Sequence, residues 1–322
     1  MNGSTIDNMS TTPHGPGLDC HIANDAERAA AFGNVYECWG DERPIDEYVA
    51  WRMQSVQHAR ATWYVGTVDG VVATSLGAYP IVLRAAEKSW PGYAIGAVHT
   101  PPEFRRRGYA ATLLDWGLQQ QLAGGAQFGL LYSDIKPEYY GGMGYRLCDS
   151  HYAWAVPRPG DHASSGRLEQ FDPAEMADGL AELYVAAQSS RSIWIERDSV
   201  YWDWVRGRYV GHNWFWWIDA GADHPSGYIQ LKSTETESRV FDWGVLPGAD
   251  ERAFWETVLQ WAANQGVARI GGWLPSSDAI AGCFDVTPRI KELTMLSPLT
   301  AEAPWNDAYS TDAAWFTECD HI

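Results

Sequence analysis

Residues 93–122 have the order of an anion-binding loop. A predicted strand, Tyr93–Thr100, is ended by two prolines and followed by Arg105-x-x-Gly108-x-Ala110. Apolar periodicity predicts a helix from about Arg107 to Leu122. The first N–H groups of a helix lack partners and carry partial positive charge, so an anion placed there is stabilised. Gly108 would let the backbone approach a phosphate closely, and Ala110 would keep the first turn small.

Two familiar phosphate motifs do not fit this loop. The dinucleotide fingerprint requires three spaced glycines, and the Walker loop requires a glycine followed later by Gly-Lys-Ser/Thr. Neither spacing occurs between residues 93 and 122. The loop therefore predicts an anion site of another kind, and by itself it does not name the ligand.

A second group of chemically active residues follows the next predicted strand, Phe128–Asp134. Its tyrosines and glycine, Tyr139, Tyr140, Gly144 and Tyr145, lie in a short helix that ends in a glycine-rich turn. The turn leads into another predicted strand, so the tyrosines lie between two strands.

Together these two motifs resemble the GNAT N-acetyltransferases. That family's acetyl-CoA loop is written Q/R-x-x-G-x-G/A, and this pattern occurs at Arg105–Ala110. A segment of the form F-Y-x-x-x-G-F/Y follows the next strand in the family, and Tyr139, Tyr140, Gly144 and Tyr145 match it in place. The resemblance implies the GNAT acyltransferase fold, an α/β structure built on a mixed sheet, with acetyl-CoA as co-substrate and no metal. Three shorter stretches are similar to the lysine N-acetyltransferases known from fungi: Cys38–Gly40, Thr100–Ala110 and Leu131–Ile135.

The resemblance also implies roles for single residues. Tyr140 matches the family tyrosine that points its hydroxyl at the coenzyme sulfur, so it is the expected general acid, with Tyr139 as the alternative. The backbone of Val98, His99 and Thr100 would pair with the pantetheine arm and polarise the thioester oxygen. The expected pyrophosphate cradle consists of Arg105, Arg106, Arg107, Gly108, Tyr109, Ala110 and Ala111.

The general base is not identified by the sequence, and several candidates stay open. His99 carries an imidazole that titrates near neutral pH, although strand alternation turns it away from Val98 and Thr100. Asp134 and Glu103 are carboxylates beside the two motifs, and Asp134 is alternatively a helix cap. In some two-lobed relatives the terminal carboxylate enters the site, which adds Ile322. A water relay is a further alternative.

Composition limits the partners. The net charge of −18 disfavours nucleic acids and anionic membranes and attracts cationic amines. The apolar runs are too short for a membrane helix, and residues 1–17 lack the apolar core of a signal peptide, so a cytoplasmic protein is expected. The five cysteines form no C-x-x-C pair, which predicts reduced thiols and no zinc site.

The predicted activity is acetyl transfer to a primary amine of a small cationic molecule, with a lysine-like acceptor favoured. An antibiotic or xenobiotic amine acetyltransferase is the alternative within the same class. A non-catalytic acyl-CoA-binding sensor is the alternative of another class. Whether the protein forms a homodimer is left open by the sequence.

The length of 322 residues favours two domains. We expect a disordered tail (1–18), an acetyl-CoA-binding catalytic domain (19–156), a Pro/Gly/Ser-rich linker (157–166) and a second domain (167–322). The second half repeats the order helix, hairpin, strand, helix, strand, but Leu246-Pro-Gly-Ala-Asp-Glu251 replaces the arginine loop. Carboxylates there would repel phosphates, so the second domain is predicted to be a degenerate GNAT-like domain that shapes the acceptor site.

The elements that must position these residues have clear patterns. Strands Thr62–Val68 and Val71–Tyr79 flank Asp69-Gly70, a strong hairpin signal. Helices are predicted over Asn24–Glu37 and Ile45–Ala61. In the second half the predictions are helices over 173–189, 199–207 and 250–265 and strands over 213–218, 227–232, 239–246 and 267–274. Most of the 18 tryptophans lie there, and we expect most of them to be core residues.

Overall fold

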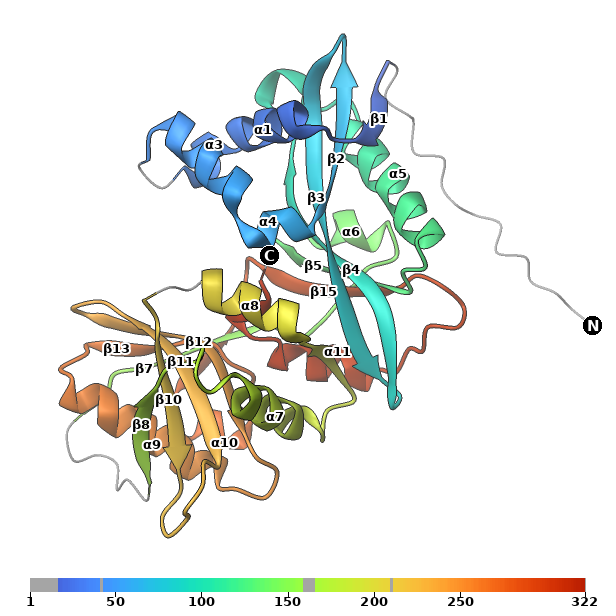
Figure 1. Cartoon of the computed structure of the whole chain (residues 1–322). Coiled ribbons are helices and arrows are strands. Elements are labelled where there is room, and N and C mark those ends of the chain that lie inside the picture. Colours follow the sequence, from blue (N-terminus) through green and yellow to red (C-terminus); the bar gives the residue numbers. More distant parts are fainter. Residues whose placement is uncertain (1–16, 41–42, 159–165, 209–210, 322) are drawn as a thin grey trace, which may run out of the picture. The chain divides into compact units, whose positions relative to one another are not determined.

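The computed structural model describes residues 17–40, 43–158, 166–208 and 211–321 (Figure 1). Most of the predicted tail, most of the predicted linker and Ile322 lie outside these ranges. The chain divides into two compact units, one made of residues 1–80 and 94–126 and the other of residues 81–93 and 127–322. Because these units are assembled from separated segments, they differ from the predicted domains 19–156 and 167–322, which stay a prediction.

The first unit is built on antiparallel strands. They are β1 (Asp19–Ile22), β2 (Thr62–Val68), the first part of β3 (Val71–Ala85) and the last part of β4 (Lys88–His99). The predicted hairpin is confirmed, because Val68 pairs with Val71 around Asp69 and Gly70. Both turn residues have positive φ, 51° and 78°, as a tight two-residue turn requires.

Helices cover both faces of these strands (Figure 1). On one face Ala31 packs with Val65 and Val72, and on the other Gly117 lies so close to the Tyr64 ring that a Cβ would come within 3.0 Å of it. The helices are α1 (Asp25–Asn34), α2 (Tyr36–Trp39), α3 (Ile45–Gln54), α4 (Val56–Arg60), the 3₁₀ turn η1 (Pro102–Phe104) and α5 (Tyr109–Ala123). Each long helix predicted before residue 62 is therefore two shorter ones.

In the second unit, one sheet continues from β4 through β5 (Phe128–Ser133) and β15 (Leu293–Pro298) to β6 (Arg146–Leu147). Strand β15 runs antiparallel to β5, with Leu296 opposite Leu130. The end of β3 pairs with β9 (Ile193–Glu196). Neither β9 nor β15 was predicted, and both bring the second half of the sequence into the sheet that contains β5.

A second sheet of this unit has the order β14-β7-β13-β12-β11-β10-β8. Strands β12 and β13 are parallel and are joined by α9, whereas the other neighbouring strands of this sheet pair antiparallel. The strands are β7 (His151–Ala155), β8 (Arg167–Phe171), β10 (Asn213–Ile218), β11 (Gly227–Ser233), β12 (Glu237–Val245), β13 (Arg269–Trp273) and β14 (Asp285–Pro288).

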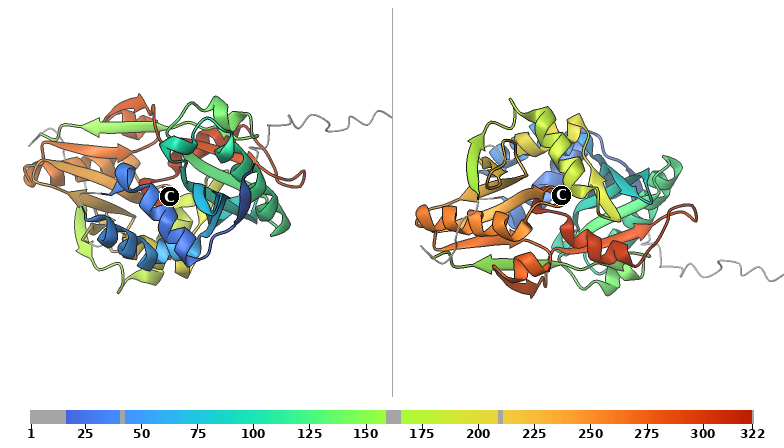
Figure 2. Two further views of the ribbon diagram at one scale, coloured as in Figure 1. Left: turned by 90° about the horizontal axis from the view of Figure 1, so that it is seen from above. Right: turned by 90° about the horizontal axis from the view of Figure 1, so that it is seen from below.

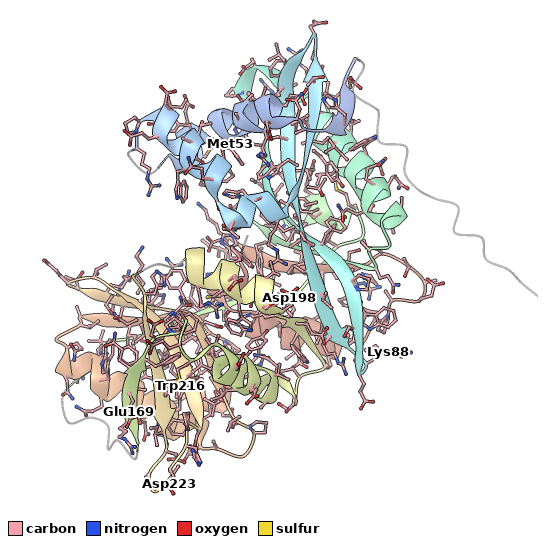
Figure 3. The ribbon with its side chains drawn as sticks, in the orientation of Figure 1. Met53, Lys88, Glu169, Asp198, Trp216 and Asp223 are labelled. Atoms are coloured by element: carbon pink, nitrogen blue, oxygen red, sulfur yellow. The ribbon has the colours of Figure 1, made fainter. Side chains whose placement is uncertain are left out.

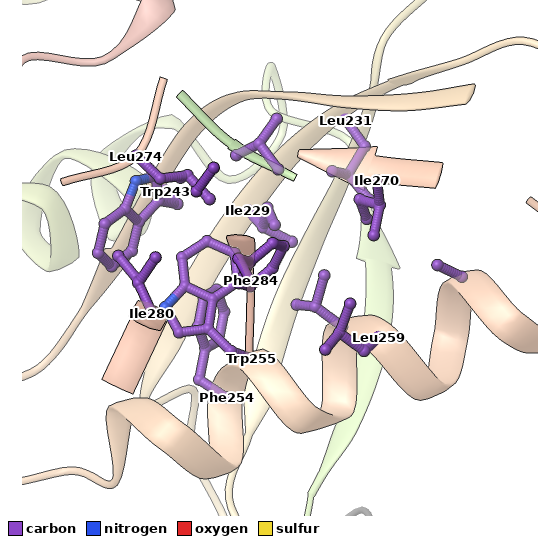
Figure 4. Close-up of a cluster of buried hydrophobic side chains, with 14 of the residues drawn as sticks. Ile229, Leu231, Trp243, Phe254, Trp255, Leu259, Ile270, Leu274, Ile280 and Phe284 are labelled. Atoms are coloured by element: carbon purple, nitrogen blue, oxygen red, sulfur yellow. The ribbon is translucent and has the colours of Figure 1, made fainter. Parts of the chain in front are cut away.

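Helices cover the second sheet on opposite faces (Figures 1 and 2). Helix α9 (Glu251–Asn264) packs on the face that holds Ile229 and Trp243, and Figure 4 shows this core. Helix α7 (Ala177–Gln188) packs on the other face, where Gly244 lies against Ala187. The remaining helices are α6 (Glu138–Gly141), α8 (Ser199–Arg208), α10 (Asp278–Ala281), α11 (Ala308–Asp312), η2 (Ala313–Trp315) and η3 (Glu318–Asp320).

The second-half elements predicted from periodicity are all present, with ends that differ by a few residues. The strand predicted at 213–218 is reproduced at both ends by β10, and the predicted helix 250–265 corresponds to α9. Asp198, labelled in Figure 3, begins α8 by accepting the N–H of Tyr201. Trp217, Trp243 and Trp255 are core residues, as expected. Within the described part of the chain, no helix has the length and apolarity needed to cross a membrane.

Candidate functional site

The predicted anion loop forms a turn that leads directly into α5. Gly108 is the N-cap and has φ +79°, a left-handed conformation that keeps it out of the helix, so α5 begins at Tyr109 and not at Arg107. Thr112 makes the first helical bond, to Gly108 O at 3.0 Å. No side chain caps this helix end. Among the described residues, the N–H groups ahead of Thr112 therefore remain available to an anion.

Two of the three arginines hold this loop in shape. Arg105 Nε donates to Thr100 O at 2.8 Å, and Arg107 Nη2 donates to Glu103 O at 3.0 Å. Arg106 has positive φ, 62°, and is exposed. The cluster thus combines cations with a preformed backbone turn, and the donor set fits a pyrophosphate group.

The end of β4, which precedes this loop, departs from regular strand geometry. Ala97 has φ +51°, which is uncommon for a residue with a side chain. Thr74 Oγ1 lies 3.1 Å from His99 O, to which it can donate, and 2.9 Å from Thr100 Oγ1. The distortion lies in the strand just before Val98, where the resemblance implies that backbone groups meet the pantetheine arm.

The tyrosine motif lies in the second unit, and its two neighbouring tyrosines have different environments. Tyr140 is 8% exposed in α6, whereas Tyr139 is 38% exposed. Burial, with the nearby Tyr139 and Asp134, raises the pKa of Tyr140 to about 12. Within the described residues the Tyr140 side chain makes no hydrogen bond. Its hydroxyl is therefore protonated near neutral pH and uncommitted.

The turn after Tyr140 is held from both ends. Tyr145 N donates to Tyr140 O at 3.1 Å, and Gly144 between them has φ +91°. The Tyr145 hydroxyl lies where a Cβ on Gly129 would be only 2.5 Å away, so the glycine of β5 makes room for it. The glycine and second tyrosine of the predicted motif thus position the first.

A family model matches residues 19–148, and its description is acetyltransferase (GNAT) domain. The matched segment contains both the arginine loop and the Tyr140 turn. Residues 19–148 thus match a GNAT acetyltransferase domain. The protein is accordingly an acyltransferase, and the matched segment contains both motifs that carry the resemblance. GNAT domains use acetyl-CoA, which agrees with the donor set at α5.

Solved structures with a similar fold include proteins named as acyltransferases. A probable N-acyltransferase from Enterococcus faecalis superposes with TM-score 0.69 at 14% identity, covering 87% of this chain and 72% of that one. A GCN5-related N-acetyltransferase from Anabaena variabilis gives 0.66 at 21%, covering 88% and 73%. Eis1 from Mycobacterium abscessus gives 0.61 at 18%, covering 89% and 74%. These likenesses confirm the predicted GNAT fold with a mixed sheet. No curated protein matches the sequence.

Helix α9, which we expected to be the counterpart of α5 in a degenerate second domain, has an N-terminus of different character. Asp250 is the N-cap of α9, and its carboxylate accepts the N–H of Ala253 at 3.1 Å. Glu251 adds a second negative charge in the first turn. An internal carboxylate thus occupies the position that an external anion would need at α9, whereas no side chain caps the N-terminus of α5.

The base candidates are found in different settings. His99 Nδ1 is buried without a hydrogen-bond partner among the described residues, and desolvation, aided by Arg105, lowers the pKa of His99 below 6.5. Asp134 is exposed and accepts the N–H of Glu292 at 3.3 Å, so it does not cap α6, whose N-cap is Pro137. Glu103 is exposed. Ile322 lies outside the described residues.

A buried polar cluster near the end of the chain was missed by the sequence analysis. Arg197 Nη1 donates to Asp242 Oδ2 at 2.6 Å, and Arg197 Nη2 donates to Asp320 Oδ1 at 3.0 Å. Thr317 donates to Asp242, and Tyr201 donates to Asp320. The partners of Arg197 lie 45 and 123 positions away in the sequence, so no local sequence pattern could have indicated them. Asp320, fully engaged here, is not available as a base.

Replacing Gly108 by alanine is expected to weaken acetyl-CoA binding. The side chain must adopt φ +79° at the helix N-cap and would project where a phosphate approaches. We expect a rise in the KM for acetyl-CoA of about tenfold, with kcat less affected. Steady-state kinetics at varied acetyl-CoA would measure it. Gly125 also has positive φ but follows α5, so Gly125→Ala serves as the control for strain alone, and an equal effect of both changes would contradict the assignment.

Proposed function

We propose that this protein transfers an acetyl group from acetyl-CoA to a primary amine of a small cationic molecule, with a lysine-like acceptor favoured. The observation that carries the proposal is the protonated and unbonded hydroxyl of Tyr140, a residue that is 8% exposed, in a chain with a segment that matches the GNAT acetyltransferase domain. Such a hydroxyl can donate a proton as the thiolate leaves.

The coenzyme supplies the acetyl group as an activated thioester. The free N–H groups at the start of α5, with Arg105, Arg106 and Arg107, would hold its pyrophosphate, and the backbone from Val98 to Thr100 would hold its arm. Tyr140 would act as the general acid, and His99, which is neutral near pH 7, is the base candidate with the best-suited protonation state. Asp134 and Ile322 remain weaker base candidates.

The acceptor assignment is supported by charge and by short sequence stretches. A net charge of −18 concentrates cations near the protein and repels anionic partners. The stretches Thr100–Ala110 and Leu131–Ile135 are similar to lysine N-acetyltransferases known from fungi. Antibiotic or xenobiotic amines are the alternative acceptors, since they carry the same reactive group and charge.

An assay of coenzyme thiol release tests this proposal. Lysine, polyamines, aminoglycosides and peptides would be offered with acetyl-CoA, and each product would be identified by its mass. We expect turnover with at least one free amine and none with its N-acetylated form. If the protein bound acetyl-CoA but acetylated none of these amines, the proposed amine acetyltransferase activity would be refuted. A non-catalytic acyl-CoA-binding sensor would then be favoured.

The ionisation of His99 gives a separate prediction. Because its folded pKa is lower than its ordinary value of 6.5, the folded protein resists the proton that the unfolded chain accepts. Stability linked to His99 is therefore lost as the pH falls below about 6.5. If His99 is the base, the acid limb of kcat/KM also has an apparent pKa below 6.5, and His99→Gln abolishes that limb. An unchanged limb in His99→Gln would exclude His99.

A further inference from the structure

Arg289 is a buried cation without a counter-ion. Arg289 comes directly after β14 in the chain and is 5% exposed. Nη2 donates to Thr294 Oγ1 at 2.7 Å, but Nε and Nη1 are buried without a hydrogen-bond partner. No carboxylate among the described residues forms an ion pair with it. Burial lowers the pKa of Arg289 to about 10, so it still carries its charge near neutral pH.

Two further unpartnered donors lie beside this guanidinium. Arg289 Cζ is 3.7 Å from the centroid of the Trp273 ring, and the Trp273 and Tyr132 rings are 5.3 Å apart. The Trp273 indole N–H and the Tyr132 hydroxyl are both buried without partners. The His321 ring also contacts both, with centroids at 5.1 and 5.2 Å. Unsatisfied donors of Arg289, Trp273 and Tyr132 thus lie around the Trp273 ring.

The carboxylates that act electrostatically on Arg289 are committed elsewhere. Glu318 Oε2 accepts from Arg239 Nε at 2.7 Å, and Glu292 Oε2 accepts the Tyr152 hydroxyl at 3.0 Å. These groups offset the positive charge only at a distance. A buried donor without a partner destabilises the fold, and a charged one does so more strongly, so several together at one place indicate an absent acceptor.

We propose that Arg289, Trp273 and Tyr132 form a subsite for a carboxylate. Arginine presents a planar fork that matches the two oxygens of a carboxylate, and the indole and phenol add neutral donors. The cation over the Trp273 face is held rigidly, which lowers the entropy lost on binding. The subsite is distinct in chemistry from the α5 N-terminus, which suits a pyrophosphate.

The subsite defines the class of acceptor, and this step rests on the proposed function. The substrate is an amine that also carries a carboxylate, such as an amino acid acetylated on its side-chain amine. Polyamines and aminoglycosides, which lack that group, would leave Arg289 unpaired and be poorer acceptors. Tyr132 is on β5 and Tyr140 is on α6, which follows β5 in the same unit.

Matched amines test the subsite without relying on turnover. Calorimetry on the full chain would compare lysine with cadaverine, and 6-aminohexanoate with hexylamine, each pair differing by one carboxylate. We expect the carboxylate-bearing member to bind at least about tenfold more tightly. Arg289→Gln should abolish the difference, and Tyr132→Phe should reduce it. Arg252→Gln, at an exposed arginine of α9, is the control.

The same pairs in the transfer assay give the kinetic form of the test. Arg289→Gln should raise the KM for lysine at least about tenfold with kcat and cadaverine kinetics little changed. Equal affinity of the unmodified protein for both members of each pair would overturn the subsite, whether or not any amine is acetylated. A variant with a few glycines added after Ile322 moves the chain's own terminal carboxylate to a new position. If only this extended variant preferred lysine over cadaverine, the terminal carboxylate of the unmodified protein would be the partner of Arg289, and the substrate proposal would be overturned.

Discussion

Replacement of Tyr140 by phenylalanine is expected to slow acetyl transfer about 10²–10⁴-fold, the usual contribution of a positioned acid. The hydroxyl is protonated at every pH below about 12 and has no partner among the described residues, so its removal deletes a proton donor without breaking a hydrogen bond. Acetyl-CoA affinity should be unchanged. Steady-state kinetics combined with calorimetry of acetyl-CoA binding would separate the two quantities.

Tyr139→Phe provides the matched control, because this tyrosine is adjacent in sequence but more exposed. Its loss should leave kcat within about threefold of the unmodified enzyme. A large fall in kcat for Tyr139→Phe with normal rates for Tyr140→Phe would exchange their roles. Normal rates in both variants would remove tyrosine from the mechanism. The high pKa of Tyr140 also means that its ionisation should not limit the alkaline side of the pH profile.

The second large effect concerns stability. Arg197→Met should lower the free energy of unfolding by about 3–5 kcal/mol, because it leaves Asp242 and Asp320 buried without their cation. Burial already raises the pKa of Asp242 against the opposing effect of Arg197, so the lost guanidinium would favour proton uptake by this carboxyl group. Denaturant unfolding followed by tryptophan fluorescence would measure the change.

Two variants sharpen this test. Arg252→Met removes an exposed arginine paired with Glu256 and should change the free energy of unfolding far less than Arg197→Met does. Adding Asp242→Asn to Arg197→Met should recover part of the lost stability, since one uncompensated charge is removed. If Arg197→Met were as mild as Arg252→Met, the cluster would contribute nothing to folding.

Local patterns predicted the elements well. The Asp69-Gly70 turn, the boundaries of β2 and β10 and the existence of α5 and α9 follow from turn chemistry and periodicity within short windows. Gly108 and Tyr140 were also singled out from the spacing of their motifs. Such features are determined by neighbours along the chain, which is why a single sequence contains them.

What depends on distant partners was not predictable. Strand β15 joins β5 across more than half the chain, and Leu296 carries no sign that its partner is Leu130. The positive φ of Ala97 has no signal, because alanine does not favour that conformation. In the sequence, Arg197, Asp242 and Asp320 look like ordinary charged surface residues. They can be buried because the fold brings them together and pairs their charges.

The long separations in the second unit have a consequence for synthesis. While the ribosome translates the chain, β5 is exposed long before β15 exists, and Arg197 lacks one of its two carboxylates until Asp320 has been made. Folding of this unit must therefore be completed after nearly all of it has been translated. The first unit, whose last segment ends at residue 126, has no such delay. Nascent chains stalled before β15 should consequently remain open to proteases and chaperones in the second unit.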